Sequence, residues 1–287
     1  MTLCNPKIWL ERAQREKFAV GAFNANTLEQ IQAIVLAAQA ENAPVMVQIS
    51  HRALQYLGNG NEMLGLEYGA AVGKVAAQSV SVPIALHLDH ANEDEVRQAI
   101  SLGFTSVMFD GSLLPLAENV ETARRLSVEA CAADVCLEAE LGKVPKPGVS
   151  DDSEALTDPA EVAAFVAKTR INLLAVALGS VHGVTEKHVS IDRERLKAIR
   201  ALVSVPLVLH GSSGVNDDEI AEGIQLGLCK VNVATQINKV FTAGARSALE
   251  HDSGMVDPRK FLGPARSAMI EAVRERIRFF GSSGKAA

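Results

Sequence analysis

Three of the seven histidines, His90, His182 and His210, stand close behind short apolar runs of the sequence. If these runs are parallel strands of one barrel, their carboxyl ends share one face and the three imidazoles converge there. Three neutral imidazoles leave one position open on a tetrahedral Zn²⁺, at about 2.0–2.1 Å per Zn–N bond, where a substrate carbonyl can be polarised. A lone histidine is more often a satisfied core or loop residue, but three in register favour a catalytic metal site.

Other polar residues follow the same kind of apolar run, so further chemistry is expected at the same face of the barrel. They are Asn24, Ser50, His51, Asp89, Asp110, Glu138, Glu140, Asn232 and Thr235. His87 lies inside its run, and we expect it to be structural or to support a ligand.

Two turns fall where barrels usually bind phosphate, through backbone N–H groups and hydroxyls. They are Gly211-Ser212-Ser213-Gly214 and Asn232-Val233-Ala234-Thr235. Glycine and serine are ordinary turn residues, but two such turns beside a candidate metal site favour a phosphorylated substrate.

The elements that must position these residues are eight short runs with the apolar, β-branched character of buried strands. The runs are Ala19–Phe23, Pro44–Ile49, Pro83–Leu88, Phe104–Phe109, Val135–Glu140, Leu173–Leu178, Pro206–Leu209 and Cys229–Val233. Stretches with helical periodicity lie between them: Leu28–Glu41, Glu93–Leu102, Pro115–Ala132, Pro159–Thr169, Arg193–Leu202 and Asp217–Leu226. Eight such units predict an α/β fold, a (β/α)8 TIM barrel. An open doubly wound sheet is the alternative, but no G-x-G-x-x-G turn follows the first strand.

Cap signals support two of the helix starts: Asp158 before a proline, and Asn216 followed by Glu219 in the pattern of a capping box. The chain ends in an amphipathic helix over 258–280 and a Gly-Ser segment that reads as a loose terminus. No linker divides the chain, so we expect one domain over 1–287.

The composition is that of a globular protein with a large core, because 48% of the 287 residues are hydrophobic. A net charge of −6 argues against a nucleic-acid partner and favours a small molecule.

Four scattered cysteines, Cys4, Cys131, Cys136 and Cys229, indicate buried free thiols rather than disulfides or a zinc knuckle. The chain shows neither a signal pattern nor a membrane-length apolar run, so we expect a cytoplasmic protein without a membrane partner.

Longer motifs carry a family resemblance. They are VPIALHLDHA (82–91), GFTSVMFDGS (103–112), LEAELGKV (137–144), ALGSVHGV (177–184), PLVLHGSSGV (206–215) and KVNVAT (230–235), with GAFNANTLEQ near the start and FGSSGKA at the end. Together they resemble the class II fructose- and tagatose-bisphosphate aldolases, in order and over nearly the whole chain. The H-x-D-H block with the later V-H-G and H-G-S-S-G blocks is far more specific than any single short motif.

The resemblance implies that the three histidines named above bind the catalytic Zn²⁺ and that Asp89 handles the proton on the C4 oxygen of the substrate. Asp110 and Glu140 match carboxylates that hold a second cation or an alternative metal position in some members. Backbone carbonyls nearby could hold a monovalent cation.

The resemblance also implies substrate contacts. Those to dihydroxyacetone phosphate match Gly183, Gly211, Ser212, Ser213, Asn232, Val233, Ala234 and Thr235, with support from Asn24 and Ser50. Arg259 resembles the arginine that reaches the distal phosphate, in some members across a subunit boundary. Arg259 and the apolar stripe of the last helix favour a homodimer or homotetramer.

The expected reaction is the reversible cleavage of fructose 1,6-bisphosphate to dihydroxyacetone phosphate and glyceraldehyde 3-phosphate. Tagatose 1,6-bisphosphate is an alternative substrate, and so is a keto-deoxy sugar phosphate of inositol catabolism. The last stays open because KVPKPGVSDDSEALTDP follows E-L-G here, where family members usually carry Gly-Gly and then the acidic base for the α-carbon. Asp151, Asp152 or Glu154 could replace that base.

Two further classes of function remain. A Schiff-base aldolase would use Lys230, although a surface or salt-bridged lysine is the commoner role. A non-catalytic sugar-phosphate-binding barrel would keep the metal site and lose the base.

Overall fold

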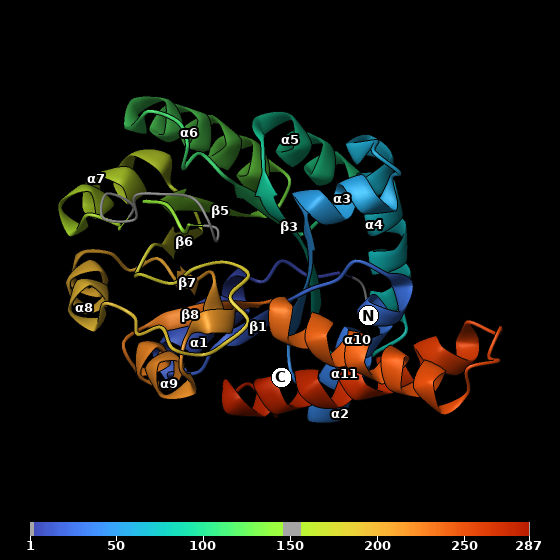
Figure 1. The fold of residues 1–287 in the computed structure, drawn as a ribbon. Helices are drawn as coiled ribbons and strands as arrows, with labels where there is room; N and C mark the ends of the chain where they lie inside the picture. Colours follow the sequence, from blue (N-terminus) through green and yellow to red (C-terminus); the bar gives the residue numbers. More distant parts are fainter. Residues whose placement is uncertain (1–2, 146–155, 287) are drawn as a thin grey trace.

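The eight predicted strands form a closed parallel barrel in sequence order, with β1 paired to β8. The computed structural model describes residues 3–145 and 156–286, and Figure 1 shows the helices around the barrel. The strands are β1 (Val20–Asn24), β2 (Val45–Ser50), β3 (Ile84–Ala91), β4 (Ser106–Phe109), β5 (Cys136–Leu141), β6 (Leu173–Val176), β7 (Leu207–Leu209) and β8 (Leu228–Val233). The prediction of a (β/α)8 barrel is confirmed.

Most helices also follow the predicted ranges. Those that do are α2 (Leu28–Glu41), α5 (Glu93–Leu102), α6 (Leu116–Ala132), α7 (Pro159–Thr169), α8 (Arg193–Leu202), α9 (Asp217–Gln225) and α11 (Arg259–Phe279). Helices outside the predicted ranges are α1 (Lys7–Glu16), α3 (His51–Leu57), α4 (Glu62–Gln78) and α10 (Thr235–His251). The short 3₁₀ turn η1 spans Ser212–Gly214.

The two predicted helix caps differ in outcome. The Asp158 side chain accepts a hydrogen bond from the backbone N–H of Ala160, as expected. Asn216 occupies the N-cap of α9, but its side chain makes no capping hydrogen bond, so that prediction of a capping box is wrong. A complete capping box forms instead at Asn92 and Glu95, at the start of α5.

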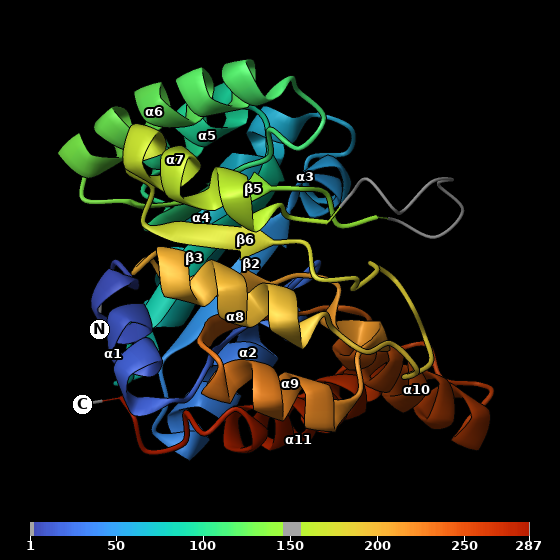
Figure 2. The same cartoon turned by 90° about the vertical axis from the view of Figure 1, so that its left-hand side faces the viewer.

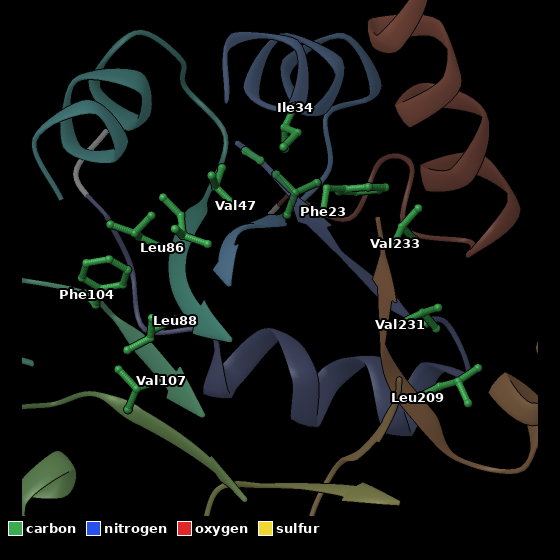
Figure 3. Close-up of a cluster of buried hydrophobic side chains, with 14 of the residues drawn as sticks. Phe23, Ile34, Val47, Leu86, Leu88, Phe104, Val107, Leu209, Val231 and Val233 are labelled. Atoms are coloured by element: carbon green, nitrogen blue, oxygen red, sulfur yellow. The ribbon is translucent and has the colours of Figure 1, made fainter. Parts of the chain in front are cut away.

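Apolar side chains fill two layers. The larger layer lies between the strands and the surrounding helices, and Figure 3 shows part of it, including Phe23, Ile34 and Leu86. The smaller layer lies inside the barrel and includes Met46 of β2 and Leu10 of α1. Helix α1 therefore closes the amino end of the barrel, on the left in Figure 2, and leaves the carboxyl ends of the strands for the site.

The carboxyl-terminal segment is docked rather than loose. Backbone N–H groups of Gly284 and Ala286 donate to the carbonyls of Glu41 and Asn42, at 2.8 and 3.0 Å. The Ser283 hydroxyl donates to the Glu41 carboxylate at 2.9 Å. The prediction of a loose terminus is wrong, because the end of α2 supplies acceptors that the sequence pattern does not reveal.

The apolar stripe of α11 is also used within the chain. Its buried residues are Ala265, Met269, Val273 and Ile277, and the helix packs against α2 and α10. The stripe therefore gives no support to a subunit interface.

The cysteines are free, as expected, but only Cys136 and Cys229 are buried, while Cys131 is exposed and Cys4 is half-buried. Among the described residues, no helix combines the length and the apolar character that a membrane span requires.

Candidate active site

A pocket opens at the carboxyl ends of the strands and collects most of the residues singled out from the sequence. The predicted residues that line it are Asn24, Ser50, His51, Asp89, His90, Asp110, His182, Gly183, Gly211, Ser212, Ser213, Asn232, Ala234 and Thr235. His210 and Glu140 lie beside it and are buried. Residues from β1, β2, β3, β7 and β8 thus meet at one place, as a barrel mouth requires.

The three histidines converge. Their ring centroids are 4.8 to 5.8 Å apart, and one nitrogen of each lies within 4.8 Å of the others. Nδ1 of His210 is 3.1 Å from Nε2 of His90. Two nitrogens bound to one tetrahedral Zn²⁺ would be about 3.3 Å apart. These residues therefore fit a metal ion.

A break in the pleat of β3 lets two consecutive residues serve the site. Side chains of a regular strand alternate between its faces, so Asp89 and His90 could not both reach the pocket. The register of β3 against β4 shifts between Leu88 and Ala91, and His90 has a φ of 53°. This left-handed conformation is uncommon for a residue with a side chain and marks local strain. It turns the imidazole of His90 toward the mouth.

Carboxylates hold His90 in place and make the centre attractive to positive charge. Oδ2 of Asp110 is 2.7 Å from Nδ1 of His90, and Oδ1 of Asp89 is 4.0 Å from Nε2. Burial alone would lower the pKa of His90, but the negative charge of Asp89 and the hydrogen bond to Asp110 raise it to about 9. The site therefore favours a cation.

Asp89 is held by two amides. Asn24 and Asn232 each donate to one of its oxygens, at 3.3 Å, and Gln48 donates to Asn24 at 2.9 Å. Burial would raise the pKa of Asp89, but the neighbouring histidines hold it below its usual range. Asp89 is therefore an oriented, ionised carboxylate that can accept a proton.

A second group of possible metal ligands shares His90 and adds Asp110 and Glu140. Oε1 of Glu140 accepts from the backbone N–H of Val144 at 3.0 Å. The buried Oε2 has no hydrogen-bond partner among the described residues. Burial and the charge of Asp110 raise the pKa of Glu140. A buried carboxylate oxygen without a partner is costly, so a cation or proton would suit this position.

The phosphate turns also have a suitable geometry. Helix α10 begins at the pocket, and its N-cap residue, Ala234, offers no side-chain cap, so the first N–H groups of the helix are available to an anion. Gly211 has a φ of 65°, and a Cβ there would lie 2.8 Å from the backbone of Val181. Only glycine suits this position.

Some predicted residues are not brought into the pocket. Val233 is buried in the outer core. The side chain of Arg259 is 90% exposed and pairs with Asp257 at 2.8 Å.

Lys230 is fully buried and pairs with Glu138 at 2.8 Å. It does not line the pocket, so the structure does not favour a Schiff base at this lysine. The candidate bases Asp151, Asp152 and Glu154 lie outside the described residues.

The pocket also contains residues that the sequence analysis did not assign to it: Asn26, Arg52 and Asn238. Arg52 is the only arginine or lysine among the described lining residues. Its place directly after Ser50-His51, at the end of a predicted strand, is the signal that could have identified it.

Comparisons with known proteins agree with this site. Residues 5–285 match the family model described as fructose-bisphosphate aldolase class-II. The chain is 40% identical to a fructose-bisphosphate aldolase of Geobacillus stearothermophilus, over all of both chains. It is 39% identical to a 6-phospho-5-dehydro-2-deoxy-D-gluconate aldolase of Bacillus subtilis, over 100% of this chain and 98% of that one. The crystal structure of the YdjI aldolase from Escherichia coli K12 superposes with a TM-score of 0.84 and 29% identity, over 99% of this chain and 100% of that one.

Proposed function

The chain belongs to the class II fructose-bisphosphate aldolase family, and from this premise we propose that it is a zinc-dependent aldolase with fructose 1,6-bisphosphate as substrate. The products are dihydroxyacetone phosphate and glyceraldehyde 3-phosphate. The single observation that supports this most strongly is the convergence of three histidines beside an ionised aspartate at the mouth of the barrel.

His90, His182 and His210 would hold the zinc, which when bound supplies a Lewis acid for the ketone oxygen of the substrate. Asp89 accepts the proton of the C4 hydroxyl as the carbon–carbon bond breaks and returns it in the reverse direction. The amides of Asn24 and Asn232 keep that carboxylate in place. Asp110 and Glu140 are the candidates for a second cation.

The two ends of the pocket suit the two phosphates of the substrate. The dihydroxyacetone phosphate half binds at Gly183, Gly211–Ser213 and the start of α10, whose first backbone N–H groups have no side-chain cap. The distal phosphate binds a guanidinium. Arg52 is available for it within the chain, because it makes no hydrogen bond or ion pair with the described residues.

Arg259 is a second candidate for the distal phosphate, in a homodimer or homotetramer that places it at the mouth of a neighbouring subunit. Its high exposure and its absence from the described lining of the pocket in its own chain are compatible with this role. The proposal predicts that dissociated subunits lose affinity for the bisphosphate.

A keto-deoxy sugar phosphate is the second candidate substrate. The dehydro-deoxygluconate aldolase of Bacillus subtilis is almost as similar to this chain as the fructose-bisphosphate aldolase is. The acidic base expected after E-L-G would come from Asp151, Asp152 or Glu154 in either case.

A substrate panel tests the proposal. Protein stripped with EDTA and reloaded with zinc is given fructose 1,6-bisphosphate, tagatose 1,6-bisphosphate and 6-phospho-5-dehydro-2-deoxygluconate, and the triose phosphate released is measured. We expect zinc-dependent cleavage with the highest kcat/KM for fructose 1,6-bisphosphate. A higher kcat/KM for another sugar would show that the substrate is not fructose 1,6-bisphosphate, while the metal-dependent mechanism would stand. Tight binding without turnover would point to a non-catalytic barrel.

A further inference from the structure

A row of buried ionisable groups lies under the pocket, and the reaction above does not use it directly. Glu138, Lys230 and His87 are each 0% exposed. Nζ of Lys230 is 2.8 Å from Oε2 of Glu138 and 3.3 Å from Nε2 of His87. Nδ1 of His87 is 2.7 Å from the hydroxyl of Ser106. Burying charges is costly even when they are paired, so this row needs a reason beyond stability.

The row ends on a candidate metal ligand. Oε1 of Glu138 is 2.8 Å from Nε2 of His210. Lys230 can only donate hydrogen bonds, and an ionised carboxylate can only accept them. The contact with Lys230 therefore keeps Glu138 as an acceptor, and Nε2 of His210 must carry the proton that it shares with Glu138.

This assignment decides where the lone pair of His210 points. A neutral imidazole with its proton on Nε2 has its lone pair on Nδ1, the atom that faces Nε2 of His90 at 3.1 Å. Asp110 holds a proton on Nδ1 of His90 in the same way, so Nε2 of His90 is the nitrogen left for a ligand. Two nitrogens that face each other at this distance need a cation between them, a proton in the metal-free protein or a metal ion in its place. The two carboxylates thus prepare the histidines for a metal.

We propose that Glu138 is a positioning residue that fixes His210 as the Nε2–H tautomer, and that Lys230, steadied by His87, keeps Glu138 in the accepting state. The inference rests on the proposed metal site, and it assigns these buried groups a role in metal affinity. A histidine ligand is commonly oriented in this way by the partner of its other nitrogen.

The variant Glu138→Gln tests the role with little change in shape. The side-chain amide has one donating and one accepting end, and the donor Lys230 draws the oxygen toward itself. The amide NH₂ then faces His210 and needs an acceptor there, which favours the wrong tautomer. We expect the zinc affinity, measured by chelator competition, to fall about 10- to 100-fold.

A second variant separates tautomer control from general damage. In Glu138→Gln/Lys230→Met the lysine no longer attracts the amide oxygen, so the amide can rotate and accept from Nε2 of His210. We expect the double variant to bind zinc more tightly than Glu138→Gln alone. Glu41→Gln is the matched control, because Glu41 is a buried carboxylate paired with Arg274 and Arg278 away from the pocket, and it should leave zinc affinity unchanged.

Imidazole ¹⁵N NMR of the zinc-loaded protein reads the tautomer itself. The proposal predicts a protonated Nε2 on His210 in the wild type and a lower zinc occupancy in Glu138→Gln under the same conditions. Wild-type affinity in a folded Glu138→Gln variant, or a protonated Nδ1 on His210 in the wild type, would overturn this inference and leave the aldolase assignment intact. A wild-type protein that binds no zinc would overturn both.

Discussion

The two ends of the barrel use the same strands for different purposes. Along the inner face of β3, Ala85 lies in the apolar layer near the amino end, His87 in the buried charged row and Asp89 at the mouth. The same progression runs along β5, from Cys136 through Glu138 to Glu140. The amino end is filled by apolar packing, whereas the carboxyl end carries a strained histidine and a carboxylate oxygen that has no hydrogen-bond partner in the described part of the chain. Such features reduce stability and are kept where function needs them.

The comparison predicts that changes at the mouth remove activity and leave the fold intact. For His90→Ala we expect kcat/KM to fall about 1,000-fold or more, because a metal supplies several kcal/mol of transition-state stabilisation. The melting temperature of the metal-free protein should change little, since His90 lies in the pocket and outside both apolar layers, while alanine keeps the left-handed strain because it also carries a Cβ. Kinetics and thermal unfolding check both parts, and a strongly destabilised metal-free variant would contradict the division between the two ends.

Asp89→Asn sharpens the same point without touching a metal ligand. We expect kcat to fall about 100- to 10,000-fold, the usual contribution of a positioned acid or base, while one zinc per chain remains bound. Metal analysis of the purified variant is the control. Near-normal kcat would show that Asp89 only orients its neighbours.

At the amino end the expectation reverses. Leu10→Ala removes a fully buried side chain from the apolar layer that α1 shares with the barrel, so the free energy of unfolding should fall by about 2–5 kcal/mol. Activity per folded molecule should be unchanged at a temperature where the variant stays folded. Denaturant titration measures the free energy of unfolding, and the cleavage assay measures the activity per folded molecule. A lower kcat in the folded variant would show that packing at the amino end affects the active site.

The sequence predicts the framework better than the details of either end. Buried apolar runs identify all eight strands, since parallel strands covered on both faces are mostly apolar. Helix α4 escapes the pattern because it contains Gly65, Gly69 and Gly73, which lower helix propensity. Those glycines allow close packing, since a Cβ at Gly65 would lie 2.2 Å from the carbonyl oxygen of Leu54.

At the site, residue types and order along the chain predict the convergence of the histidines, but not how it is achieved. The left-handed turn at His90 depends on a register shift that no local pattern reveals. The place of Arg52 depends on where α3 begins, and the role proposed for Arg259 would require a neighbouring subunit. Positions that depend on tertiary or quaternary context lie beyond a single sequence.

The substitution Arg52→Ala should have a smaller effect than the changes at the metal site, because Arg52 is proposed to bind only the distal phosphate. For Arg52→Ala we expect KM for fructose 1,6-bisphosphate to rise about tenfold, the effect of losing a charge-assisted contact of about 1.4 kcal/mol. KM for a substrate without the distal phosphate should hardly change. The matched variant Arg259→Ala assigns the contact, because whichever arginine binds the distal phosphate should show the larger effect.

The substitution Glu41→Gln should have the smallest effect on activity, because Glu41 forms ion pairs beyond the amino end of β2 and away from the pocket. Hydrogen bonds from Arg278 and Arg274 lower the pKa of Glu41 to about 2, against the opposing effect of burial. A lowered pKa in the folded state means that stability is present above the unfolded pKa of about 4.3 and is lost as the pH falls toward 2. Unfolding measured across this range should show a weaker pH dependence in Glu41→Gln, with kcat unchanged at neutral pH. An equal pH dependence of the free energy of unfolding in both proteins would show that the ion pairs of Glu41 do not contribute to stability.

Zinc titration of the EDTA-stripped wild-type protein, followed by cleavage of fructose 1,6-bisphosphate, tests the central claim most directly. The account predicts no cleavage without metal and a linear rise in activity that stops at one zinc per chain. Full cleavage by the stripped protein, or trapping of a substrate adduct on Lys230 by borohydride, would contradict a metal-dependent reaction at the mouth of the barrel.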